Sequence, residues 1–126
     1  MAAQPRRILV GFDGSHASWR ALETAIQLTG YGSTLTVVTV APEGETPSTD
    51  ALAAARERVR SRQLAATYLQ RAGDPVEELL GAAREGGVEL VVVGRSVAGD
   101  GAPLDDPASI SASVVRRAAC DVLVVS

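Results

Sequence analysis

Four short runs of aliphatic and β-branched residues constrain the fold of this chain more than any other feature. They read ILVGF at 8–12, LTVVTVA at 35–41, LVVVG at 90–94 and VLVV at 122–125. None shows the strict alternation of apolar and polar residues that is typical of strands with one solvated face. We therefore expect a parallel sheet whose strands are buried on both faces. A fifth and weaker strand candidate, 65–73, should lie nearer an edge.

Segments with helical patterning separate these runs. Residues 15–30 place apolar side chains on one broad face, and Ser15 is positioned to cap the first turn. Further helices are expected within 49–63, within 74–87 and over 107–119. The resulting order, β-α-β-α-β-α-β-α-β, predicts an open Rossmann-like α/β sheet with right-handed crossovers and helices on both faces.

The length and composition are those of one compact unit. A chain of 126 residues with 46% hydrophobic and 21% charged residues has the usual size of a single domain, which we expect to span 1–126. The net charge is -3, and the 12 basic residues, all of them arginines, are scattered singly or in pairs. This distribution is unlike a nucleic-acid-binding footprint, so no nucleic-acid partner is expected.

The sequence has few cysteines and histidines for a disulfide or a metal site. Cys120 is the only cysteine and His16 the only histidine, so we expect no internal disulfide and no cysteine- or histidine-rich metal site. The apolar run nearest the N-terminus, Ile8 to Phe12, is far shorter than a signal-peptide core or a membrane span. We therefore expect a cytoplasmic protein without membrane association.

Ligand chemistry is expected where the strands end. In open parallel sheets, ligands bind outside the carboxyl ends of the strands, near the point where strand order reverses. The loop after the fourth strand, 94–111, has three glycines before the last helix and serines at its start, which are the ingredients of a phosphate-binding loop. It also carries three aspartates, Asp100, Asp105 and Asp106.

Four longer signatures occur in register over nearly the whole chain. They are VGFDGSHASWRAL at 10–22, GDPVEELL at 73–80, ELVVVG at 89–94 and ACDVLVV at 119–125. Together they resemble the universal stress protein (UspA-like) family. The resemblance implies a role in stress response and a five-stranded parallel sheet of order 3-2-1-4-5.

The resemblance also implies a homodimer. In many members of the family the last strands of two copies pair antiparallel. An apolar strand at a sheet edge would otherwise be an aggregation risk, which agrees with this expectation. The residues of that strand in this chain are Asp121, Val122, Leu123, Val124 and Val125.

One branch of the family binds ATP through a motif of the form G-x2-G-x9-G-S/T after the fourth strand. Gly94 matches the first glycine and Ser109 the hydroxyl residue, but Val97 and Ala108 stand at the other two glycine positions. The stretch is also one residue longer than the motif. The resemblance would further place Asp13 near the ribose and phosphates and the backbone of Val40 against the adenine edge. The candidate nucleotide site therefore comprises Asp13, Val40, Gly94, Arg95, Ser109 and Ile110.

The aspartates of the loop argue against a bound phosphate. Phosphates are held by backbone N–H groups that must approach them closely, and a β-branched residue such as Val97 suits that role poorly. Asp105 and Asp106 precede the last helix, where a carboxylate cap would use the same donors and repel the phosphate. With no lysine in the chain, a Walker A loop is excluded. Arg95 is the only cation in the loop, and it could offset an aspartate or reach a ligand.

Three functions are then open. The favoured interpretation is a non-enzymatic stress-response module with a weak or absent nucleotide site, no required cofactor and an unidentified protein partner. The alternative is an ATP- or AMP-binding sensor that uses Gly99, Gly101, Arg95 and Ser109 in an altered arrangement. A slow nucleotide hydrolase is the third, but the sequence offers no base or metal cluster beyond Asp13, and no catalytic residue is expected.

Overall fold

The computed structural model describes residues 6–30, 32–45, 49–95 and 110–126. Within these residues, strands and helices alternate along the chain as the sequence predicts. The elements are β1 (Arg7–Gly11), α1 (His16–Leu28), β2 (Thr34–Ala41), α2 (Thr49–Ser61), β3 (Thr67–Ala72), α3 (Pro75–Glu85), β4 (Leu90–Gly94), α4 (Ile110–Arg117) and β5 (Asp121–Val125). The expected start of the last helix at 107 lies outside the described residues.

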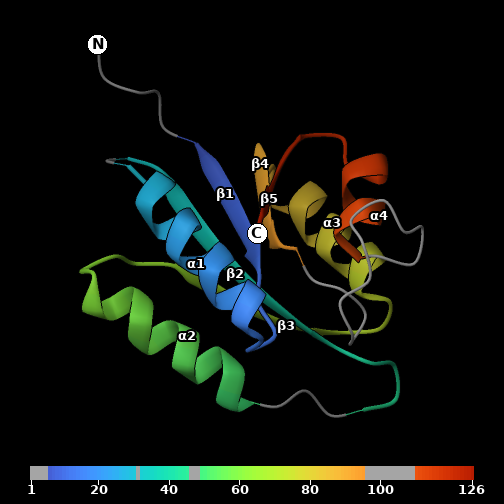
Figure 1. The fold of residues 1–126 in the computed structure, drawn as a ribbon, viewed down its shortest axis with the longest axis horizontal. Helices are drawn as coiled ribbons and strands as arrows, with labels where there is room; N and C mark the ends of the chain where they lie inside the picture. The colour runs from blue at the N-terminus through green and yellow to red at the C-terminus, as the bar shows by residue number, and fades with distance from the viewer. Residues whose placement is uncertain (1–5, 31, 46–48, 96–109) are drawn as a thin grey trace.

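The five strands form one parallel sheet in the order β3-β2-β1-β4-β5, which confirms the order that the family resemblance implies. The weakest strand candidate, β3, lies at an edge as expected, and β5 forms the other edge. Helices α1 and α2 cover one face of the sheet, and α3 and α4 cover the other (Figure 1). Strand order reverses between β1 and β4, so the carboxyl ends of these strands border the expected site.

The central strand β1 shows why its sequence does not alternate. Ile8 and Val10 pack into the core beneath α1 and α2, whereas Leu9 points to the opposite face and packs with α3 and α4. All three side chains are buried. Because both faces of the sheet are covered by helices, every position along the strand favours an apolar side chain.

Two helices begin with caps at the carboxyl edge of the sheet. The Ser15 hydroxyl accepts a hydrogen bond from the Ser18 N–H at 3.2 Å, which confirms the predicted cap of α1. The Asp74 carboxylate accepts from the Glu77 N–H at 3.0 Å, and Pro75 occupies the first turn of α3. The caps hold the first turns of α1 and α3 on either side of the strand ends. None of the helices described here has the length and apolar character needed to cross a bilayer.

Candidate functional site

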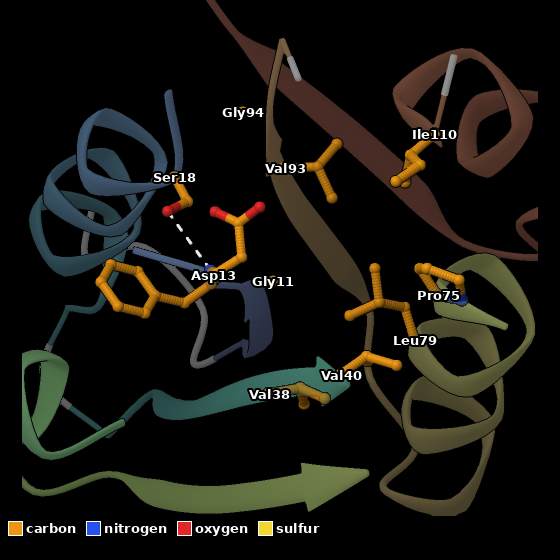
Figure 2. A pocket seen from close by; sticks show the side chains of 11 residues that line it. Gly11, Asp13, Ser18, Val38, Val40, Pro75, Leu79, Val93, Gly94 and Ile110 are labelled. Carbon is orange, nitrogen blue, oxygen red and sulfur yellow. Dashed lines mark hydrogen bonds between the residues drawn. The ribbon is translucent and has the colours of Figure 1, made fainter. Parts of the chain in front are cut away.

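A hollow lies at the carboxyl ends of β1, β2 and β4 (Figure 2). It contains about 560 Å³ of empty space, part of which is open to solvent. Six elements (β1, α1, β2, α3, β4 and α4) and the turn after β1 contribute to its lining. The lining residues are Gly11, Phe12, Asp13, Ser18, Val38, Val40, Pro75, Leu79, Val93, Gly94 and Ile110.

Most of the lining is apolar. Figure 2 shows the side chains of β2, β4, α3 and α4 gathered on one side of the hollow and Asp13 on the other. A largely apolar lining with few polar groups is typical of sites that hold small organic molecules. The apolar side is made by Val38, Val40, Pro75, Leu79, Val93 and Ile110.

The polar side is the turn that connects β1 to α1. The Ser15 N–H donates to Asp13 Oδ1 at 2.8 Å, and the Asp13 N–H donates to the Ser18 hydroxyl at 3.3 Å. That hydroxyl in turn donates to the Ser15 carbonyl at 2.9 Å. Gly14 supports the turn with a φ of 84°, a conformation that side chains disfavour. Asp13 is therefore anchored by local hydrogen bonds, with its carboxylate directed toward the end of β4 (Figure 2).

These hydrogen bonds also favour the charged form of Asp13. Partial burial acts to raise the pKa of Asp13, but the hydrogen bonds that its carboxyl group receives from Ser15 and Ser18 outweigh that effect and lower the pKa below its ordinary value. The side chain is consequently ionised at neutral pH. It is the only charged side chain among the described residues that line the hollow.

The end of β4 packs closely against the first turn of α1. A Cβ atom on Gly94 would lie 2.5 Å from the carbonyl oxygen of Ala17 and 2.6 Å from its carbonyl carbon. Glycine at this position therefore lets β4 approach the backbone of α1 closely. The Arg95 N–H donates to the Val125 carbonyl at 2.7 Å, which extends the pairing of β4 with β5.

The structure brings together four of the predicted site residues, which all line the hollow: Asp13, Val40, Gly94 and Ile110. Arg95 is exposed and does not belong to the lining, and its side chain forms no ion pair with any described carboxylate. Ser109 and the rest of the loop 96–109, including Asp100, Asp105 and Asp106, lie outside the described residues. The predicted competition between these aspartates and a phosphate stays a prediction.

Sequence reasoning missed the contribution of α3. Pro75 and Leu79 line the hollow although they follow β3, whose end was not considered as part of the site. Pro75 fits a helix start, and Leu79 fits the apolar face of a helix, so local patterns explain both without a site. The available signal was the segment 73–80, which is one of the four that carry the family resemblance.

Other reactive side chains lie away from the hollow. His16 is exposed in the first turn of α1 and does not line the site. Burial raises the pKa of the Cys120 thiol, and its side chain packs against the core on the α3 and α4 face. Among the described residues, no three His, Cys, Asp or Glu side chains are placed to hold a metal ion.

The fold and the position of the hollow agree with a match to a known family. The profile of the Universal stress protein family matches residues 5–126. This chain belongs to the universal stress protein family. The family resemblance of the four sequence segments is thereby confirmed. No curated protein sequence matches the chain significantly.

Solved structures with a similar fold include universal stress proteins. A universal stress protein in complex with cAMP has 26% sequence identity and a TM-score of 0.76, and the match covers 96% of this chain and 97% of that chain. A protein from Mycobacterium tuberculosis H37Rv has 30% identity and a TM-score of 0.70, covering 100% and 98% of the two chains. A universal stress protein family member from Burkholderia pseudomallei has 28% identity and a TM-score of 0.65, covering 95% of each chain.

Proposed function

We propose that this chain is a non-enzymatic regulatory module of the universal stress protein family whose hollow binds nucleotides weakly or not at all. The observation that carries the proposal is the departure of the loop after β4 from the ATP-binding motif, because Val97 and Ala108 stand where the motif has glycines. Asp13 is the only charged side chain among the described residues that line the hollow. A phosphate in the hollow would meet this carboxylate without a described cation beside it. Two like charges 4 Å apart cost about 1 kcal/mol in water and about 4 kcal/mol near a protein surface.

The packing of Gly94 supports the same proposal. In the ATP-binding motif of the family, the first glycine belongs to the phosphate loop, and Gly94 is its counterpart. Here the backbone of Ala17 fills the space where a Cβ atom would lie. The glycine is thus required for the contact between β4 and α1 whether or not a phosphate binds, and its retention is no sign of nucleotide binding.

A regulatory role is also favoured over catalysis. Hydrolysis of a nucleotide needs a positioned base or a metal ion in addition to phosphate binding. The histidine of the chain, His16, lies outside the lining, and the described residues offer no metal-binding cluster. Asp13 is held by the hydrogen bond from the Ser15 N–H, and its lowered pKa makes it a weak base.

The test is thermal unfolding and calorimetric titration with MgATP, ADP and AMP at millimolar concentration. A ligand at a hundred times its dissociation constant stabilises a fold by about 2.7 kcal/mol, and we expect no such shift. The matched variant is Asp13→Asn, which removes the charge and keeps an acceptor for Ser15. We expect it to bind AMP more tightly than the wild type does. Tight binding of MgATP by the wild type would contradict the proposal.

A cyclic-nucleotide sensor is the second candidate. It is favoured by the relative in complex with cAMP, which is 26% identical and is matched over 96% of this chain. A cyclic phosphodiester carries a single negative charge, whereas a triphosphate carries several, so the repulsion from Asp13 is smaller for cAMP. Titration with cAMP belongs in the same series, and a micromolar dissociation constant would establish this candidate instead.

We further propose that two copies associate through β5, the strand that the family resemblance implies for the dimer. This strand forms a free edge of the sheet, and Leu123 on it is 36% exposed. Sedimentation of the wild type at tens of micromolar should show a dimer, and Leu123→Asp should shift it to a monomer. Val115→Asp is the control, because Val115 is an exposed apolar residue of α4 rather than of the edge strand. A monomeric wild type would contradict the dimer.

A further inference from the structure

We infer that the sheet edge at β3, together with two arginines of α2 beside it, is a docking surface for an extended acidic segment of a partner protein. The segment adds to the sheet along β3 and places carboxylates against Arg56 and Arg60. This surface lies at the opposite edge from β5, and the inference does not depend on whether the hollow binds a nucleotide.

The arginines of α2 form two pairs with different surroundings. Arg58 and Arg62 are four residues apart, and both pair with Glu23 of α1; Arg62 Nη2 lies 2.9 Å from Glu23 Oε2. Arg56 and Arg60 are also four residues apart and are exposed. They form an ion pair with no carboxylate in the described part of the chain. Packing of α2 against α1 therefore uses the charge of one pair and leaves that of the other available.

Tyr68 of β3 shows that the second pair lies beside the sheet edge. The guanidinium carbon of Arg56 is 5.7 Å from the centroid of the Tyr68 ring, which is the distance of a cation–π contact. Burial raises the pKa of Tyr68, and the positive charges of Arg56 and Arg60 act in the opposite direction, so both groups lie near this side chain. Glu57 lines the same surface hollow as the two arginines but is within ion-pairing distance of neither. The face of β3 that α2 covers is therefore bordered by two positive charges.

The backbone of β3 offers the groups that an added strand needs. Within the described residues, β3 pairs with β2 alone and forms one edge of the sheet. The Gly73 N–H donates to the Ala41 carbonyl of β2 at 2.9 Å, and the direction of the backbone groups alternates along a strand. Tyr68 and alternate residues after it therefore direct their N–H and C=O groups away from β2. An extended peptide that pairs with such an edge gains main-chain hydrogen bonds.

The charge of this edge selects an acidic segment over a basic one. Every second side chain of an added strand points to the face that α2 covers, where carboxylates can accept charge-assisted hydrogen bonds from Arg56 and Arg60. A lysine-rich segment would be repelled there. Positive charge beside an exposed edge also opposes indiscriminate strand pairing, so the same two side chains deter aggregation and favour an acidic partner.

Two blocked heptapeptides test the inference. In both, threonine alternates with a charged residue, which is glutamate in one peptide and lysine in the other. We expect the glutamate peptide to bind at least about tenfold more tightly at low ionic strength, and the difference should shrink as salt screens the charges. The amide signal of Tyr68 should shift and its hydrogen exchange should slow, whereas the amides of β5 should not change.

A third peptide separates strand pairing from charge alone. It is the glutamate peptide with methyl groups on two adjacent central amide nitrogens, which keep its charge and remove main-chain donors on both of its edges. We expect it to bind at least about tenfold more weakly than the unmethylated peptide. Equally tight binding of the methylated peptide would show that no strand is added to β3.

The double variant Arg56→Gln and Arg60→Gln gives the decisive result. Both side chains are exposed, so the fold should be retained, and we expect most of the preference for the glutamate peptide to disappear. Arg20→Gln with Arg116→Gln is the control, because it changes the net charge equally at exposed positions of α1 and α4 and should leave the preference intact.

Four results would overturn the inference. They are an unchanged preference in the first double variant, equal or undetectable binding of the glutamate and lysine peptides by the wild type, signal changes that map to β5, and tighter binding of a thymidine oligonucleotide than of the glutamate peptide. The last result would assign the arginines to a nucleic-acid phosphate backbone instead of a protein segment.

Discussion

The turn after β1 and the end of β4 border the same hollow, and each keeps a residue that the family resemblance assigns to nucleotide binding. Asp13 in the turn is hydrogen-bonded to the Ser15 N–H at 2.8 Å and still presents its carboxylate to the hollow. Gly94 is packed so closely on Ala17 that a Cβ atom would lie 2.5 Å from the carbonyl oxygen. Both residues have structural roles, and Asp13 also presents a charged side chain to the hollow.

The first turn of α1 contacts both the turn after β1 and the end of β4. Ser15 and Ser18 hold the turn that carries Asp13, and Ala17 between them meets Gly94. The positions of the carboxylate and of the β4 end are therefore coupled through one helical turn. A motif residue can therefore be retained for structural reasons alone. Ligand binding has to be judged from the chemical groups that each residue presents to the hollow.

Gly94→Ala should have the largest effect. The new methyl group would overlap backbone atoms of Ala17, which can move only if α1 and β4 separate. We expect a loss of about 3 kcal/mol in the free energy of unfolding, measured by urea denaturation. Gly30→Ala is the control, because no atom lies within 4 Å of a Cβ built there, and its effect should stay below about 1 kcal/mol. Equal effects of the two changes would disprove the steric role of Gly94.

Ser18 and Thr39 both have buried hydroxyl groups, but the two groups differ in their hydrogen bonding. Ser18 is 5% exposed and hydrogen-bonded within the turn, whereas Thr39 on β2 is 7% exposed and its hydroxyl has no partner among the described residues. Ser18→Ala should cost about 2 kcal/mol, because it leaves the Asp13 N–H without its acceptor. Thr39→Val, which is similar in shape, should stabilise the fold by about 1 kcal/mol. Chemical denaturation measures both, and destabilisation by Thr39→Val would indicate a hydrogen-bond partner for this hydroxyl.

The contribution of Asp13 to the stability of the fold is measured by comparing two substitutions. Asp13→Ala removes the acceptor for the Ser15 N–H and should lower the free energy of unfolding by about 1 kcal/mol. Asp13→Asn keeps an acceptor and should cost less. If both variants are as stable as the wild type in thermal unfolding, the hydrogen bond in the turn contributes nothing, and the residue is retained for the hollow alone.

The smallest expected effect is the pH dependence that Asp13 contributes. Its pKa in the folded protein lies below the ordinary value, so its charged form stabilises the fold. That contribution is fully present above the pKa of an unfolded aspartate, about 4, and is lost as the pH falls through the lower folded pKa. The difference in stability between wild type and Asp13→Asn should therefore shift against the wild type between pH 5 and acidic pH, by less than about 1 kcal/mol because solvent screens the group. A constant difference across this range would show that the pKa of Asp13 is not lowered.

Much of the fold was predictable because its signals are local. The run 90–94 indicated a doubly buried strand, and all five residues of β4 are buried. Ser15 was recognised as a cap from its place before a helical pattern, and it caps α1. Part of the site was equally predictable, since Asp13 and Val40 lie at the ends of strands that meet at one edge of the sheet. Pro75 and Leu79 were not predicted, because their local roles in α3 explain them fully.

The sequence by itself determined which segments are strands and helices and which faces they bury, because the spacing of apolar residues along the chain must match the period of each element. It also determined that the chain has a carboxylate after the first strand and no lysine to neutralise it. Only the tertiary structure decided that Ala17 fills the space beside Gly94 and that Leu79 and Val40 line the same hollow. Such contacts depend on the distance between backbones that are far apart in the chain, and no local pattern of residues records that distance.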